Sequence, residues 1–100
     1  MKTYAYLLKL NPRLYDDHAW TKEDNAAVTA HFLRLKEDHE KGKVLHVGRT
    51  EDPRWDGFGF VVFLAENDEE AKRYANSDPA VTNGQMTVTY YPYKNVMPFM

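Results

Sequence analysis

Residues 58–65, FGFVVFLA, are apolar on both faces of an extended chain. The two alternating sets that a strand would present here are Phe58, Phe60, Val62 and Leu64 on one side, and Val61, Phe63 and Ala65 on the other. A strand without a polar face has to be buried on both sides of its sheet. Two helices can cover only one face of a four-stranded sheet, so this segment indicates a second apolar face that needs other cover.

The rest of the chain supplies three more strands and two helices in a fixed order. We expect strands over 4–10, 43–50, 58–65 and 86–93, and helices over about 22–41 and 68–76. The order is β-α-β-β-α-β, which predicts an α+β fold of the ferredoxin-like kind: a four-stranded antiparallel sheet with two helices on one face. The length predicts a single domain over residues 1–100, with a core at about 4–93 and a C-terminal tail at 94–100.

Short polar and glycine signals set the ends of both helices. Thr21 is a candidate N-cap with Asp24 in the capping-box position, and Gly42 is a suitable stop for the same helix. Asn67 or Asp68 can cap the second helix.

One apolar stripe predicts which side of the first helix is buried. At 100° per residue, Val28, Phe32, Leu35 and His39 fall on one line. Ala27, His31 and Asp38 border that line, which places His31 at the edge of the buried face. In the strand over 43–50, Val44, His46 and Gly48 should share one face, opposite Leu45, Val47 and Arg49.

Exposed apolar faces on a small domain usually mark a partner site. The second face of the predicted sheet is such a face, since strands 4–10 and 86–93 also carry apolar and tyrosine side chains on both sides. We therefore expect an isologous homodimer that packs sheet against sheet.

Composition excludes several classes of function. Thirteen basic and fifteen acidic residues, with no long block of one sign, argue against a dedicated nucleic-acid partner. The longest apolar run, 60–65, is too short to span a bilayer, and the N-terminus lacks a secretory pattern. The absence of cysteine excludes thiol catalysis and thiolate metal sites and fits a cytoplasmic protein. We expect no cofactor and no metal, because no metal-binding histidine pair or glycine-rich phosphate loop occurs.

Two short motifs, in order, resemble those of the YCII-related (YciI-like) domain family. The first is His31-Phe-Leu-Arg-Leu, followed by Gly42 and the segment 44–48; the second is Asp78-Pro79, followed by Gly84 and a strand that ends at Tyr91-Pro92. The resemblance extends from residue 4 to about residue 93. It implies the dimeric α/β-barrel superfamily, which includes muconolactone isomerase-like proteins and cofactor-independent monooxygenases.

The resemblance also implies an active site in which a histidine of the first helix faces the aspartate of an Asp-Pro motif. In this chain those residues are His31 and Asp78. Many members of the family carry an arginine three residues before the histidine, where this chain has Val28. The loop 51–57, which contains Trp55, is not a hallmark of the family.

Each residue of the pair has two interpretations. His31 is either a helix histidine bonded to a nearby carbonyl or a general base, since imidazole titrates near neutrality. Asp78 is either the cap of a short turn that Pro79 begins, or the carboxylate that orients His31. The two roles of Asp78 are compatible, because it has two oxygens. A working pair needs a separation of about 2.6 to 3.2 Å.

Arg13, Arg49 and Trp55 lie at strand ends and in loops, where pockets form, whereas Tyr6 belongs to a set of strand aromatics that more often form sheet core and dimer interface. Arg13 and Arg49 are candidates for holding an anionic substrate, or are solvated charges, and Trp55 and Tyr6 are candidates for contacting the substrate. Ser77 is best interpreted as a turn residue, so no nucleophile is evident. His18, His39 and His46 are expected at or near the surface.

Two functions follow from these residues. The first is a small cofactor-independent enzyme that uses His31 and Asp78 for proton transfer on a small organic substrate, as an isomerase, lyase or hydrolase. The alternative is a non-catalytic dimeric module that binds a small ligand or a partner protein, with His31 and Asp78 as a buried structural pair.

Overall fold

Four strands form one antiparallel sheet with the order β2-β3-β1-β4 in a computed structural model of the chain, which describes residues 1–97. The strands are β1 (Lys2–Leu10), β2 (Val44–Arg49), β3 (Gly59–Ala65) and β4 (Met86–Pro92). Central strand β1 pairs with β3 along one edge and with β4 along the other. The predicted ferredoxin-like fold is therefore confirmed.

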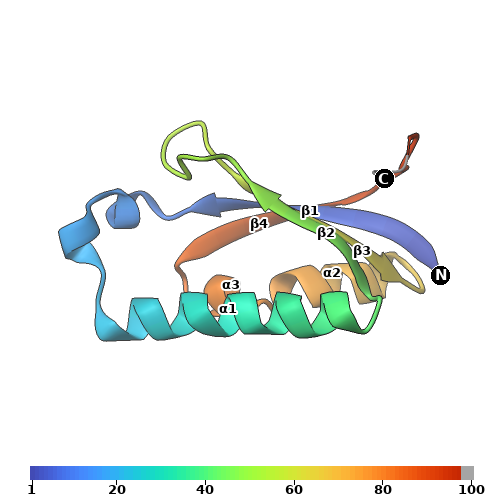
Figure 1. Ribbon diagram of the computed structural model, residues 1–100, viewed down its shortest axis with the longest axis horizontal. Helices are drawn as coiled ribbons and strands as arrows, with labels where there is room; N and C mark the ends of the chain where they lie inside the picture. Colours follow the sequence, from blue (N-terminus) through green and yellow to red (C-terminus); the bar gives the residue numbers. More distant parts are fainter. Residues whose placement is uncertain (98–100) are drawn as a thin grey trace.

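Three α-helices lie along one face of this sheet (Figure 1). They are α1 (Lys22–Glu40), α2 (Asp68–Asn76) and the short α3 (Pro79–Thr82), and two short 3-10 turns, η1 (Pro12–Tyr15) and η2 (Asp17–Ala19), connect β1 to α1. Helix α3 occupies the position where the sequence predicted a short turn after Asp78-Pro79. None of the helices in residues 1–97 is long and apolar enough to cross a membrane. Of the predicted tail, 94–97 has no helix or strand, and 98–100 lie outside the described residues.

The predicted helix caps are present. The Thr21 hydroxyl accepts from the backbone N–H of Asp24, and the Asp24 carboxylate accepts from the backbone N–H of Thr21, which completes the capping box. Asn67, not Asp68, caps α2 by accepting from the backbone N–H of Glu70. Gly42 follows α1 with a φ of 82°, a left-handed conformation that favours glycine.

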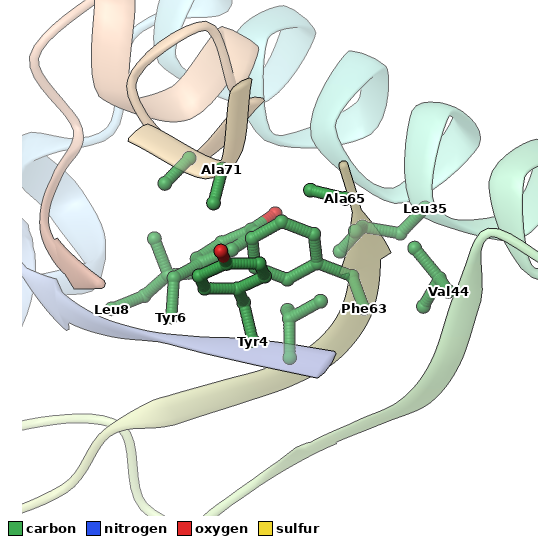
Figure 2. Packing of buried hydrophobic residues seen from close by; sticks show 10 residues of the cluster. Tyr4, Tyr6, Leu8, Leu35, Val44, Phe63, Ala65 and Ala71 are labelled. Carbon is green, nitrogen blue, oxygen red and sulfur yellow. The ribbon is translucent and has the colours of Figure 1, made fainter. Parts of the chain in front are cut away.

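The core lies between the helices and the sheet. Aromatic side chains of β1 and β3 occupy its centre, where the rings of Tyr6 and Phe63 pack edge to face at 5.6 Å (Figure 2). Leu35 of α1 and the alanines of α2 close over them. The opposite sheet face carries apolar residues on β1 and β3, where Ala5 and Val62 are buried and Leu7 and Leu64 are half-buried, together with Lys9 and the threonines of β1 and β4. The prediction that residues 58–65 lack a polar face is confirmed.

The buried side of α1 differs from the predicted stripe. The buried residues are Asp24, Ala27, His31 and Leu35, whereas Phe32 is 51% exposed. Helix α1 packs against α3 and β2, so the side that faces the protein is centred on His31. Apolar periodicity placed His31 at the edge because it counts imidazole and carboxylate groups as polar.

The side chains of β2 do not alternate regularly between the two faces of the sheet. Val44 lies opposite Phe63 and Val47 lies opposite Val61, so a bulge between Val44 and His46 keeps both valines on the helix-covered face. The expected grouping of Val44 with His46 and Gly48 is wrong for this reason.

The orientation of α1 can be tested with a pair of leucines. Replacement of the buried Leu35 by alanine should lower the free energy of unfolding by about 2–5 kcal/mol, because it leaves a cavity against the sheet. Leu33→Ala, at a side chain that is 61% exposed, should change it by less than about 0.5 kcal/mol. Urea unfolding followed by circular dichroism measures both. Equal effects of the two substitutions would contradict the orientation.

Candidate active site

His31 and Asp78 meet in the interior of the protein. His31 Nδ1 lies 2.8 Å from Asp78 Oδ1 and 2.7 Å from Asp78 Oδ2. The imidazole comes from the middle of α1 and the carboxylate from the residue that caps α3, 47 positions later in the chain. Asp78 is fully buried and His31 is 3% exposed. The separation falls in the range that a proton-transfer pair needs.

Two further donors hold the Asp78 carboxylate. The Tyr6 hydroxyl donates to Oδ2 at 2.8 Å, and the backbone N–H of Ala80 donates to Oδ1 at 3.0 Å. Asp78 therefore caps α3 and contacts His31 at the same time. Burial by itself raises the pKa of Asp78, but hydrogen bonds from His31, Tyr6 and Ala80 and the charge of His31 bring that pKa below its ordinary value. The group is a buried carboxylate rather than a carboxylic acid at neutral pH.

The ionised carboxylate determines where the imidazole carries its proton. A carboxylate only accepts, so Nδ1 is the donor and carries the proton. In the neutral ring, Nε2 is left with a free lone pair. Among residues 1–97, Nε2 has no hydrogen-bond partner. The fully enclosed side-chain atom that lacks a partner in these residues is Gln85 Oε1, so His31 Nε2 keeps some accessible surface. The free nitrogen of His31 is thus the one that a ligand can reach.

Tyr6 contacts Asp78 and does not line the cavity described next. Burial, followed by the charge of Asp78 and the hydrogen bond to it, raises the pKa of Tyr6 far above its ordinary value. The phenol keeps its proton and remains a donor to Asp78. Tyr6 was predicted to contact the substrate, but its hydroxyl donates to Asp78 and the residue is absent from the cavity lining.

A cavity of about 280 Å³ opens beside His31 between α1, the helix-covered side of the sheet and the start of β3. Its lining is mostly apolar and includes Trp20, Val28, Phe32, Val47, Phe58 and Gly59. Two of the lining residues, His31 and Arg49, have ionisable side chains. An apolar, partly enclosed hollow with few polar groups is the usual form of a small-molecule site.

The remaining predicted site residues are divided between the cavity and other places. Arg49 lines the cavity. Arg13 is 2.8 Å from the buried Asp24, whose pKa it holds far below the ordinary range, and it lies outside the lining. Trp55 packs against Tyr15 and is 61% exposed, also outside the lining.

Other residues that were considered from the sequence lie outside the pair and the cavity. Ser77 is bonded to Tyr74 and Arg34. His18, His39 and His46 are exposed, as expected. Residues 1–97 contain no group of three or more His, Cys, Asp or Glu side chains that could hold a metal ion.

Several lining residues were not anticipated from the sequence. Trp20, Phe58 and Gly59 come from three separate segments, and no local pattern joins them. Val28 and Phe32 were assigned to the core and instead line the cavity, because α1 turns the side centred on His31 toward the protein.

Comparison with known proteins agrees with this architecture. The sequence model of the YCII-related domain matches residues 3–94. The chain belongs to the YCII-related domain family. This YCII-related domain is also similar to the solved 5-chloro-2-hydroxyhydroquinone dehydrochlorinase (TftG) from Burkholderia phenoliruptrix AC1100, in complex with 2,5-dihydroxybenzoquinone, with a TM-score of 0.59 and 16% identity. The similarity covers 92% of this chain and 93% of that chain and shows a shared fold. A search of curated proteins found no significant match.

The proton position in His31 can be tested by replacing Asp78 with asparagine. In the wild type, long-range proton–nitrogen NMR spectra should show the proton of neutral His31 on Nδ1. The introduced amide should donate to Nδ1 and move the proton to Nε2, and unfolding should become easier by about 1–3 kcal/mol because Tyr6 and Ala80 lose a charged acceptor. As a control, Asp68→Asn, which changes the partner of Tyr4, should leave His31 unaffected. A wild-type ring protonated on Nε2 would contradict the assignment.

Proposed function

We propose that this YCII-related domain is a cofactor-independent enzyme in which His31 takes a proton from a small organic substrate bound in the adjacent cavity. One observation carries the proposal: a buried imidazole whose Nδ1 donates to an ionised carboxylate and whose Nε2 keeps accessible surface beside an apolar cavity. This arrangement makes Nε2 a base and stabilises the imidazolium that forms when it accepts a proton.

The step begins when Nε2 accepts a proton from a C–H or O–H group of the substrate. The bonding electrons remain on the substrate, and the imidazolium is stabilised by Asp78 at 2.7 Å. The substrate anion then either takes the proton back at another atom, which is an isomerisation, or expels a leaving group with its electron pair, which is an elimination; in the second case the imidazolium releases its proton to the leaving group or to water. Neither route needs a nucleophilic side chain, and Ser77, the nearest candidate in sequence, is bonded elsewhere.

The size and lining of the cavity favour a single substituted ring. An apolar cavity of about 150 Å³ holds benzene in other proteins, and this one is about 280 Å³. Trp20, Phe32 and Phe58 offer aromatic surface to such a ring. The fold shared with TftG supports this choice, because that protein is named for removing hydrogen chloride from a chlorinated hydroquinone and was solved with a benzoquinone bound.

Tyr6 is a positioning residue in this proposal, since it acts on the substrate only through Asp78. Its hydrogen bond occupies the Oδ2 lone pair that His31 does not use and limits rotation of the carboxylate.

A cytoplasmic location belongs to the same proposal, because a chain without cysteine does not depend on an oxidising compartment.

The proposal predicts that activity depends on His31. Hydroquinones and chlorinated phenols should be incubated with the protein in deuterated water, with proton exchange followed by NMR and chloride release by electrode. His31→Gln should reduce the rate for any substrate found by about 100-fold or more, because a positioned base contributes at least that much.

His39→Gln is the matched control, since His39 is exposed on the same helix and should be dispensable. A His31→Gln variant within threefold of the wild-type rate would remove His31 from the mechanism. Aromatic compounds that shift His31 resonances without exchanging a proton would instead support the non-catalytic binding module.

We also propose that the protein is a homodimer through the sheet face that the helices leave uncovered. Within residues 1–97 no helix lies on that face, and it carries the half-buried Leu7 and Leu64 and also Tyr91, which is 44% exposed (Figure 1). A second copy would cover these groups symmetrically.

Sedimentation velocity tests the dimer. The wild type should sediment as a dimer at micromolar concentration, and Leu7→Lys should shift it toward the monomer by placing a charge at the centre of the face. Leu33→Lys, which adds the same charge at an exposed position on α1, should remain dimeric. A monomeric wild type would exclude the proposed interface.

A further inference from the structure

Arg49 is an exposed residue at the end of β2 that lines the cavity. It pairs with Gly59 of β3, and Gly59 also pairs with Leu8 of β1, whose side chain belongs to the core. Side chains that are directly opposite one another in neighbouring strands share a face, so Arg49 lies on the helix-covered side with Leu8. Its place in the cavity lining agrees with this register.

Arg49 is also the arginine of residues 1–97 that has no carboxylate partner. The other four, Arg13, Arg34, Arg54 and Arg73, each lie within 4.0 Å of an aspartate or glutamate. Arg49 Nη1 instead donates to the backbone carbonyls of Thr50 and Glu51, at 2.9 and 2.7 Å. These two bonds fix the guanidinium at the end of β2 and leave its remaining N–H groups for another acceptor.

The position opposite Arg49 carries no side chain. A Cβ added to Gly59 would lie 3.6 Å from Cβ and Cδ1 of Leu8, an ordinary contact distance, and Gly59 is not among the glycines with positive φ. Neither packing nor backbone conformation therefore requires glycine there. Because Gly59 has no side chain, its backbone forms the cavity wall between Arg49 and Leu8.

We propose that the cavity binds a planar aromatic anion, with its ring over Gly59 and its carboxylate or phenolate oxygen paired with Arg49. The aromatic lining suits the ring, and a guanidinium that is held by two backbone carbonyls and has no carboxylate partner suits an anionic oxygen. This inference deepens the proposed function and rests on it: it adds the charge of the substrate to the proton transfer assigned to His31. Gly59 and Arg49 are the residues that determine specificity.

Isothermal titration with benzoate and its neutral analogue benzamide tests the role of Arg49. The wild type should bind benzoate more tightly than benzamide. Arg49→Gln should weaken benzoate binding by about tenfold or more, as expected for loss of a charged hydrogen bond, and change benzamide binding less than twofold. Arg73→Gln, the same charge change on the exposed face of α2, should bind both as the wild type does. Equal benzoate affinity in the wild type and Arg49→Gln, or no benzoate binding by the wild type, overturns the proposal.

Gly59→Ala tests the position of the ring. The added methyl should weaken benzoate and benzamide alike while leaving the midpoint of thermal unfolding unchanged, because its contacts with Leu8 are ordinary. Unchanged binding of both compounds would show that the ring does not lie over Gly59.

His31→Gln separates this inference from the proposed function. The variant should keep benzoate binding although turnover is lost. Loss of benzoate binding in His31→Gln, with full binding in Arg49→Gln, would assign the anion to the imidazole and overturn the role of Arg49. If no substrate is turned over but Arg49→Gln alone loses benzoate, the anion site stands and the catalytic proposal fails.

Discussion

The buried carboxylate of Asp78 determines how the helical layer meets the sheet. An ionised group with no exposed surface is strongly unfavourable unless its oxygens accept hydrogen bonds, and here the donors come from three elements: Tyr6 of β1, His31 of α1 and the first turn of α3. All three have to be in place together for the charge to be satisfied. This requirement turns α1 so that His31, rather than the more apolar Phe32, faces the interior. One polar group thus overrides the orientation that apolar periodicity favours.

The chain contains a second buried carboxylate, and its surroundings differ from those of Asp78 in a way that bears on the proposed proton transfer. Asp24 accepts from the Arg13 guanidinium, from Gln85 and from Thr21, and its pKa is held far below the ordinary range, mainly by Arg13. A guanidinium does not give up its proton, so that pair has one charge state and serves the N-terminus of α1. The partner of Asp78 is an imidazole, which can gain a proton at its other nitrogen. The His31 ring lines the cavity, and Asp24 does not.

Much of the fold and part of the site could be predicted because they depend on local signals. The order of strands and helices follows from alternating segments and caps, whereas the facing of His31 and Asp78 was implied only by the resemblance to the YCII-related domain family. Non-local packing accounts for what was missed. The bulge after Val44 exchanges the faces of β2, and no residue in that segment signals it. Arg13 and Arg49 look alike as strand-end arginines, yet Asp24, 11 residues beyond Arg13, neutralises only the first of them.

Asp78, which contacts His31, and Arg49, which lines the cavity, carry opposite charges on either side of the proposed proton transfer. When Nε2 takes a proton, the positive charge that forms on His31 is stabilised by Asp78, which is already ionised and fixed by Tyr6 and Ala80. The electrons left on the substrate make it more negative, and Arg49 is the cation in the lining that can stabilise them. The His31–Asp78 pair is buried, so its interaction is less weakened by solvent than it would be on an open surface, whereas Arg49 is exposed at the end of β2. A neutral side chain in place of Arg49 would leave the substrate charge without a partner, and an ordinary ion pair at Arg49 would have the same effect. The lack of an internal carboxylate partner for Arg49 is therefore what the proposed chemistry requires.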